Sequence, residues 1–203
     1  MLKFKIGRKT ISNNHPTYFI ADIAANHDGN LARAYKLIEL AKEAGADAAK
    51  FQNFQAQKIV SSRGFENLSE QLSHQKHWKG SIYETYEQAS VPREWAPKLR
   101  EKCDEIGIEF LSTPFDTESA TFLNDMMDVF KISSSDITNK PFIEYLCNSG
   151  KPIILSTGAS YLHEIQEAVE WIDSKKVPVA LLHCILNYPT DDKNAHLGMI
   201  KDL

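Results

Sequence analysis

Two lysines inside apolar segments are the residues of this 203-residue chain whose chemistry is most informative. Lys50 is flanked by alanines and a phenylalanine, and Lys131 follows a valine and a phenylalanine. Burying an ammonium group without a partner costs several kcal/mol. We therefore expect each lysine to meet an anion, which is either a bound ligand or a protein carboxylate such as Asp22 or Asp136.

Short polar residues end several other apolar segments, at Thr113, Ser134, Ser156 and Gly158. Hydroxyl groups and a glycine just before a helix suit a phosphate, because backbone N–H groups and the helix dipole favour anions. Each residue alone is more often a helix cap. Their convergence with two lysines favours a phosphate site. The chain has no Gly-x-Gly-x-x-Gly or Walker motif, which argues against a nucleotide cofactor.

The histidines give no comparable signal. His27 follows the first apolar segment beside a turn, where it is either a base or ligand or a side chain that bonds the backbone. No two histidines have the i, i+4 spacing of a helical metal site. We predict no metal ligand among these residues.

Six apolar segments must position these groups, and helical patterns separate them. The segments are residues 19–26, 48–52, 110–114, 129–134, 153–158 and 179–184. This alternation is typical of parallel strands covered by helices, and chemistry at their C-terminal ends is typical of an α/β barrel. A closed barrel has eight strands in about 250 residues. We predict an α/β fold, a (β/α)8 TIM-type barrel that is incomplete here with about six strands, as one domain over residues 1–203. The alternative is an open doubly wound sheet, whose strand order reverses.

Helix signals fall between the segments. Asn30 is a good N-cap for a helix that stops at Gly45, and Pro92 opens one that ends at Gly107. Further helices are expected after Asp116, after Pro141 and from residue 160 or 161. Residues 3–15 read as a hairpin that closes the bottom of the barrel. The polar stretch 53–90 is predicted to be a long loop, such as a lid or a binding loop.

Bulk composition narrows the class of partner. The net charge of −4 argues against nucleic acid, and no segment approaches the length of a membrane span. Three scattered cysteines without Cys-x-x-Cys spacing indicate a reducing cytoplasm and no structural zinc. We expect a cytoplasmic protein with small-molecule substrates and neither nucleic acid nor membrane as a partner.

Six ordered motifs resemble the sialic acid synthase (N-acetylneuraminate synthase) family, which condenses phosphoenolpyruvate with an N-acylated hexosamine. The motifs are residues 20–29, 44–52, 112–115, 130–136, 150–158, and 181–184 with 187–189. The resemblance implies an eight-stranded barrel followed by a small antifreeze-protein-like domain, and this chain is expected to stop before strands seven and eight and before that domain. It also implies a homodimer when the protein is full length, and a divalent metal, Mn²⁺ or Mg²⁺, whose ligands lie outside this chain. Residues 1–203 alone would be inactive.

The resemblance also implies roles for individual residues. The phosphoenolpyruvate pocket would comprise Lys50, Lys131, Thr113, Ser134, Ser156 and Gly158. Sugar-side contacts would be Gln52, Phe115 and Tyr188, with Asn187 in support. Asp22 and Asp136 stand where better-known members have glutamate, and with the two lysines they form the predicted catalytic set. Carbon 3 of phosphoenolpyruvate would attack the open-chain aldehyde of an N-acetylmannosamine-like sugar, and phosphate would leave after water adds at carbon 2. The product would be a nonulosonic acid for a surface polysaccharide such as lipopolysaccharide.

Two other functions stay open at this point. One is a Schiff-base aldolase with Lys131 or Lys50 as the nucleophile. The other is a non-catalytic fragment that binds sugar or phosphate. The sugar is equally open, because N-acetylmannosamine, a legionaminic precursor and a pseudaminic precursor all fit the sequence.

Overall fold

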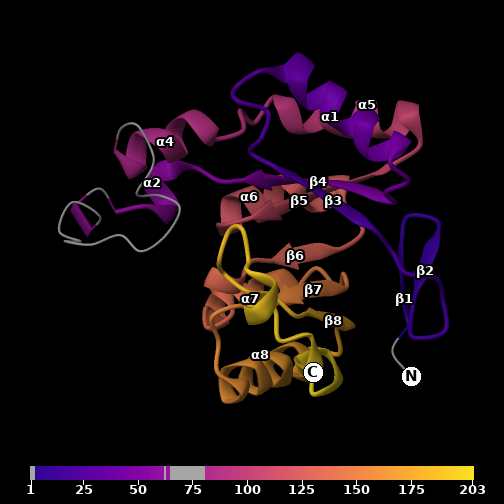
Figure 1. Cartoon of the computed structure of the whole chain (residues 1–203), viewed down its shortest axis with the longest axis vertical. Coiled ribbons are helices and arrows are strands. Elements are labelled where there is room, and N and C mark those ends of the chain that lie inside the picture. Colours follow the sequence, from indigo (N-terminus) through magenta and orange to yellow (C-terminus); the bar gives the residue numbers. More distant parts are fainter. Residues whose placement is uncertain (1–2, 62, 65–80) are drawn as a thin grey trace.

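Six parallel strands in sequential order form two neighbouring sheets (Figure 1). The computed structural model describes residues 3–61, 63–64 and 81–203. One sheet has the order β3 (Ile20–Ala24), β4 (Ala48–Asn53), β5 (Glu109–Pro114), and the other β6 (Phe130–Ile132), β7 (Ile153–Ser156), β8 (Val179–Leu182). The strand order does not reverse, so the doubly wound alternative is wrong. The α/β architecture is of the TIM type, and the barrel is not closed.

A break separates β5 from β6, although the two strands lie next to each other. Only a gap between the sixth and first strands is expected from the sequence. At this break the backbone N–H of Ser112 donates to Met127 Sδ at 2.9 Å. A thioether is a weak acceptor, and β6 has only three residues, so no ladder joins β5 to β6 in the described part of the chain.

Helices cover the outer faces of both sheets. They are α1 (Leu31–Glu43), α5 (Trp95–Ile106), α6 (Thr117–Leu123), α7 (Lys140–Cys147) and α8 (Leu162–Ser174). The predicted caps are confirmed where side chains accept backbone hydrogen bonds. Asn30 accepts from Arg33 N–H at 3.0 Å, and Asp116 from Ser119 N–H at 2.9 Å. Gly45 follows α1 with φ +87°, a conformation that favours glycine. Pro92 stands three residues before its helix, which begins at Trp95.

The stretch 53–90 is not simply a loop, so that prediction is wrong in part. It contains α2 (Ala56–Ile59) and α4 (Ile82–Ala89). A capping box starts α4, because Ser81 Oγ accepts from Glu84 N–H and Glu84 accepts from Ser81 N–H, both at 3.1 Å. Residues 62 and 65–80 lie outside the described residues, so the lid hypothesis stays a prediction.

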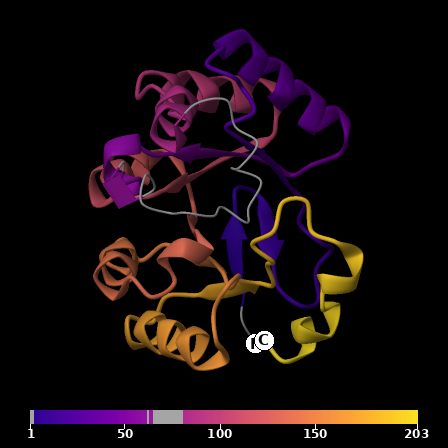
Figure 2. The same ribbon diagram turned by 60° about the vertical axis from the view of Figure 1, so that its left-hand side comes forward.

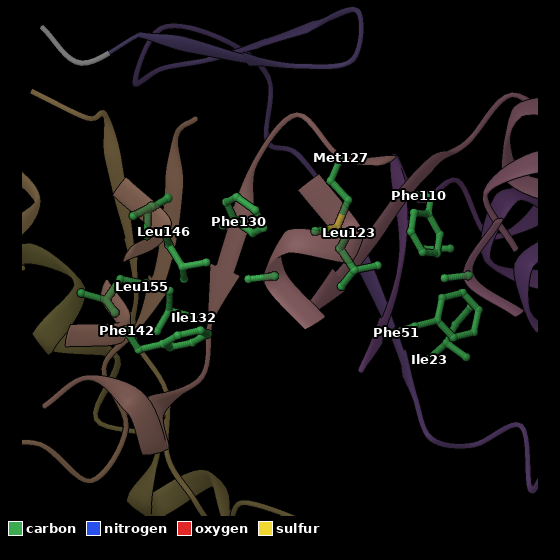
Figure 3. Close-up of a cluster of buried hydrophobic side chains, with 14 of the residues drawn as sticks. Ile23, Phe51, Phe110, Leu123, Met127, Phe130, Ile132, Phe142, Leu146 and Leu155 are labelled. Carbon is green, nitrogen blue, oxygen red and sulfur yellow. The ribbon is translucent and has the colours of Figure 1, made fainter. Parts of the chain in front are cut away.

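The largest hydrophobic cluster lies between the strands and these helices. Figure 3 shows it extending from Phe51 and Phe110 through Leu123 to Phe130 and Leu155. Phe51 and Leu155 are almost completely buried. These residues alternate along their strands with others that face the opposite way.

A β-hairpin packs against that opposite, inner face at the N-terminal ends of the strands. It comprises β1 (Phe4–Ile6) and β2 (Lys9–Ile11), as predicted for residues 3–15. In Figure 2 it is seen between the magenta helices and the orange helices. Its buried apolar cluster consists of Phe4, Ile6, Ala48, Leu111, Val129 and Ile154. The hairpin lies at one end of the strands, and α2 and α4 lie at the other (Figure 1).

Among the described residues, no helix has the length and apolar character needed to cross a membrane.

Candidate active site

The predicted polar residues share the inner face of the strands, above the hairpin. Ala48 and Leu111 pack on the hairpin, so Lys50 and Gln52 in β4 and Thr113 in β5 point to the same side by strand alternation. Gln52 pairs in register with Thr113.

The same alternation holds in the other strands. Val129 packs on the hairpin two residues before Lys131, and Ile154 does so two residues before Ser156. Asp22 is in register with Lys50. The C-terminal half of the inner face is therefore polar where the N-terminal half is apolar.

Lys50 is an ion-paired lysine. Its Nζ lies 2.7 Å from Asp22 Oδ1, and its side chain is 7% exposed while that of Asp22 is 59% exposed. The carboxylate partner that the sequence left open thus exists for Lys50. Because Asp22 is exposed, it offsets the lysine charge while remaining accessible to a ligand.

Lys131 is different, because the described residues provide no carboxylate within ion-pairing distance of its Nζ. Burial, followed by repulsion from Lys50, lowers the pKa of Lys131 to about 8. Asp22, Cys184 and Asp136 act in the opposite direction. Among the described residues, the two lysines therefore have one ion-paired carboxylate between them, which is favourable for an anion.

Asp136 lies in the short 3-10 helix Ser134–Asp136 that follows β6. Burial raises the pKa of Asp136, although hydrogen bonds from Ser135 and Asn139 and the charge of Lys131 lower it. A carboxyl group with a raised pKa retains its proton more readily, which suits a proton donor.

The hydroxyl residues are buried at the same end of the strands. Thr113 is 1% exposed, and its Oγ1 has no hydrogen-bond partner among the described residues. Ser156 is equally buried. Ser134 Oγ accepts a hydrogen bond from Gly158 N–H at 3.0 Å. The Gly158 N–H is therefore already used within the protein, which differs from the expectation that it is available to a phosphate.

Gly158 is required for a steric reason. A Cβ at this position would lie 3.0 Å from Ser134 Oγ, 3.0 Å from Leu186 Cγ and 3.2 Å from the Cys184 carbonyl oxygen. The glycine therefore allows the loop after β7 to approach Ser134 and the loop after β8.

The predicted sugar-side residues lie in three different places. Gln52 is half-buried in β4, and Phe115 is half-buried just after β5. Asn187 and Tyr188 are exposed in the loop after β8, and Tyr188 is 64% exposed. Partial burial, then Cys184 and Asp22, raise the pKa of Tyr188. The Tyr188 hydroxyl is thus in electrostatic range of Asp22. The backbone carbonyl oxygen of Asn187 accepts a hydrogen bond from Thr190 Oγ1 at 2.7 Å.

Comparison with known proteins decides the family. The model of the NeuB family matches residues 37–203. The chain belongs to the NeuB family. It is 35% identical to the N,N'-diacetyllegionaminic acid synthase of Campylobacter jejuni, over 92% of this chain and 57% of that protein. It is 33% identical to the spore coat polysaccharide biosynthesis protein SpsE of Bacillus subtilis, over 98% of this chain and 53% of that protein.

A solved relative supports the same assignment. The crystal structure of the N-acetylneuraminic acid (sialic acid) synthetase from Leptospira borgpetersenii, in complex with citrate, superposes with a TM-score of 0.84 at 30% identity. The alignment covers 98% of this chain and 65% of that one. The chain spans about half the length of the curated relatives that it matches.

The described part of this NeuB-family chain does not by itself fit a divalent metal. No three histidine, cysteine, aspartate or glutamate side chains converge there to hold an ion. That the metal ligands lie outside these residues stays a prediction.

His27 forms a hydrogen bond with the backbone, which is one of the two roles that the sequence left open for it. It is fully buried, its Nδ1 accepts from Gly29 N–H at 3.1 Å, and its ring meets Trp95 edge-on at 5.4 Å. Burial lowers its pKa. It is a neutral core residue beside a turn.

Two aromatic residues near the candidate site are not predicted from the sequence. Phe54 contacts both Phe115 and Tyr86 through its ring. Phe54 stands two residues after Gln52, so the alternation of β4 would have placed it on the inner face. Tyr86 lies on α4, in the stretch predicted as a loop.

Proposed function

We propose that the protein containing these residues condenses phosphoenolpyruvate with an N-acylated hexosamine and releases phosphate. The observation that carries this proposal is the pair of lysines on the inner face of the strands of a NeuB-family chain. Lys50 is paired with Asp22, and Lys131 has no ion-paired carboxylate among the described residues. Two of the named relatives are an N,N'-diacetyllegionaminic acid synthase and a sialic acid synthetase, which supports the same reaction class here.

In this reaction carbon 3 of phosphoenolpyruvate forms a bond to the aldehyde carbon of the acceptor. The aldehyde oxygen takes a proton, and water adds to carbon 2 and loses one proton. The bond between carbon 2 and the phosphate oxygen then breaks, the new hydroxyl group gives its remaining proton to the leaving phosphate, and a ketone is left at carbon 2. Lys131 and Lys50 would neutralise the phosphate and carboxylate charges, which fixed cations do well in a water-poor site. Asp136, whose pKa is raised, would supply the proton, and Asp22 would accept one from water.

The metal, homodimer, cytoplasmic location and role in surface polysaccharide synthesis belong to the same proposal. They rest on the family resemblance. No step above is assigned to a metal, since the described residues do not form its site.

A Schiff-base aldolase is the second candidate, and the pKa of Lys131 near 8 favours it. A lysine must be unprotonated to attack a carbonyl group, and a neighbouring cation is one way to achieve this. Against it, two of the relatives named above, at 35% and 30% identity, are named as a legionaminic acid synthase and a sialic acid synthetase.

The whole protein distinguishes the two candidates in one pair of assays. With phosphoenolpyruvate and an acceptor sugar, one phosphate should appear for each keto acid formed. Borohydride with pyruvate should leave the mass of the protein unchanged. A covalent adduct at Lys131, or a keto acid formed without phosphate, would establish the aldolase instead. Lys140→Ala is the control variant and should change neither assay, because Lys140 lies on α7 over the Trp171 ring and away from the inner face.

A further inference from the structure

The side chain of Met127 occupies the break between the two sheets. Met127 precedes β6 and is 3% exposed, and in Figure 3 it is seen between Phe130 of β6 and Phe110 of β5. Its Sδ accepts the hydrogen bond from Ser112 N–H at 2.9 Å. In a continuous parallel sheet that N–H would instead donate to a carbonyl oxygen of the neighbouring strand. Met127 therefore takes the place of a backbone partner from β6.

The backbone of Met127 is fixed by the second sheet. Lys151, two residues before β7, donates through Nζ to the Met127 carbonyl oxygen at 2.7 Å and also to the Asn124 carbonyl oxygen. The same ammonium group lies over the Phe130 ring, 5.9 Å from its centroid. The Met127 side chain is thus held at its base by residues next to β6 and β7, while its sulfur contacts β5.

The two lysines of the candidate site lie on opposite sides of this break. Lys50 belongs to β4, which pairs with β5 in a regular ladder of six residue pairs, so these two strands lie about 4.8 Å apart. Lys131 belongs to β6, for which the described ranges show no ladder with β5. The separation of the lysines across β5 is therefore fixed by hydrogen bonds on one side and by the bulk of Met127 on the other.

The charge state of Lys131 depends on that separation. Burial and then the charge of Lys50 lower the pKa of Lys131 to about 8, while Asp22, Cys184 and Asp136 act to raise it. Between like charges several ångströms apart in a protein, a change of about 1 Å in separation shifts a pKa by about 0.2–0.5 pH unit. The spacing of β5 and β6 therefore affects how well the lysines hold an anion.

We propose that Met127 is a positioning residue, a spacer that keeps β5 and β6 apart and so sets the distance between Lys50 and Lys131. The proposal rests on the proposed function only for the identity of the anion that the lysines bind. The spacer itself rests on the contacts of Met127 with Ser112 and Lys151. With a shorter side chain in its place, Ser112 N–H would turn to a carbonyl oxygen of β6, and the two strands would close.

Titration of Lys131 in the whole protein, without any ligand, tests the spacer. With isotope-labelled lysine, the NMR signal of the Lys131 Cε gives the midpoint, and its loss in Lys131→Arg assigns the signal. Met127→Val shortens the spacer, so the lysines should approach and the midpoint should fall by at least about 0.3 pH unit. An unchanged or raised midpoint in the folded variant would overturn the proposal.

Met127→Leu is the conservative variant that should retain the spacing. Leucine has nearly the volume of methionine but no acceptor, and such exchanges are well tolerated in cores. Its midpoint should lie within about 0.1 pH unit of the wild type, although the melting temperature should fall because Ser112 N–H loses its partner. A midpoint as low in Met127→Leu as in Met127→Val would contradict the role of the side-chain bulk.

Leu146→Ala is the matched control. Leu146 is 1% exposed in the same hydrophobic cluster, but it lies on α7, away from the break. It should lower the melting temperature at least as much as Met127→Val does and leave the midpoint of Lys131 unchanged. An equal shift in Leu146→Ala would come from general loosening, and the proposal would be wrong.

Amide hydrogen exchange reports the closure of the strands directly. A carbonyl oxygen is a stronger acceptor than a thioether. Relative to its neighbours Leu111 and Thr113, Ser112 N–H should therefore exchange about fivefold more slowly in Met127→Val than in the wild type. Faster relative exchange in the variant would mean that the strands do not close, which would refute the spacer.

The spacer and the condensation reaction fail separately. A lowered midpoint in Met127→Val, together with no phosphoenolpyruvate-dependent phosphate release by the wild type, would support the spacer and refute the condensation. Phosphate release by the wild type, together with an unchanged midpoint in Met127→Val, would support the condensation and refute the spacer.

Discussion

The two ends of the inner face are built from the same strands and differ in almost every property. At the N-terminal end Leu111, Val129 and Ile154 pack on a hairpin. Two residues further along each strand stand the polar residues Thr113, Lys131 and Ser156. The positive charge of Lys131 has no ion-paired carboxylate among the described residues. One step of the strand repeat therefore separates the residues that stabilise the fold from those that would bind a ligand.

This separation predicts which substitutions should change stability and which should change ligand affinity. Residues under the hairpin bury apolar surface, so their loss should lower stability without altering ligand affinity. Among the described residues above it, Lys131 has no ion-paired carboxylate and the Thr113 hydroxyl has no hydrogen-bond partner. Retaining these groups costs folding free energy, so their loss should alter affinity without lowering stability. The four predictions below test this division, from the largest expected change in free energy to the smallest.

Ile6→Ala should destabilise the fold most. Ile6 is 2% exposed in the hairpin cluster, and an isoleucine-to-alanine change in a core costs about 2–5 kcal/mol. Urea unfolding should show this loss, while affinity for phosphoenolpyruvate, measured where the variant is still folded, stays unchanged. Ile200→Ala is the control, because Ile200 is 60% exposed and should have almost no effect. A changed affinity in Ile6→Ala would mean that the two ends are coupled.

Lys131→Ala should give the complementary result. A charge-assisted contact is worth about 1.5–3 kcal/mol, which is about one to two orders of magnitude in affinity. The melting temperature should stay equal or rise, since an uncompensated buried cation is removed. Lys131→Arg retains the charge but not the shape and should recover only part of the affinity. Calorimetric titration with phosphoenolpyruvate measures the affinity, and thermal unfolding measures the melting temperature. If Lys131 were structural, Lys131→Ala would retain the affinity and lower the melting temperature.

The pH dependence of binding should sharpen the role of Lys131. Its pKa is lowered to about 8 by burial and by Lys50, so it is a cation below that pH and neutral above it. Affinity for phosphoenolpyruvate, whose own phosphate is already fully ionised there, should fall about tenfold for each pH unit above 8, which is about 1.4 kcal/mol per unit. Arginine remains charged throughout this range, so Lys131→Arg should remove the decline. A decline that persists in Lys131→Arg would belong to another group.

Local signals in the sequence were sufficient for the helix caps and the strands. Asn30, Gly45 and Asp116 act within four residues of themselves, and the confirmed strand order follows from repeated alternation of strands and helices. The placement of both lysines on the same face, toward the C-terminal ends of the strands, follows from the same repetition.

Most features of the structure that the sequence did not predict depend on contacts between distant segments. The sequence did not distinguish Lys50 from Lys131, because their difference arises from the register that places Asp22 beside Lys50 alone. The bond from Gly158 to Ser134 spans 24 residues and has no local signature. The α4 helix is an exception, because its signal is local: Ser81 and Glu84 form a capping box, which the polar composition of residues 53–90 obscured.

The smallest expected effect belongs to a second lysine–aspartate pair, at the opposite end from Lys50 and Asp22. Lys9 pairs with Asp47 beside the hairpin, but here the lysine side chain is 63% exposed and the carboxylate 8% exposed. Asp47 also accepts from Phe19 N–H at 2.7 Å, so it retains a partner without Lys9. Lys9→Ala should therefore cost at most about 1 kcal/mol of unfolding free energy and leave ligand affinity unchanged.

The pH and salt dependence of that small loss identify its cause. Burial acts to raise the pKa of Asp47, and the hydrogen bonds from Lys9 and Phe19 hold it below its ordinary value. A carboxylate with a lowered pKa stabilises the fold above the ordinary aspartate value of about 3.9 and loses that contribution as the pH falls below it. The difference between wild type and Lys9→Ala should thus be present at neutral pH, shrink in high salt, and disappear in acid. A loss that is equally large in acid would come from packing of the lysine stem on the hairpin and not from its charge.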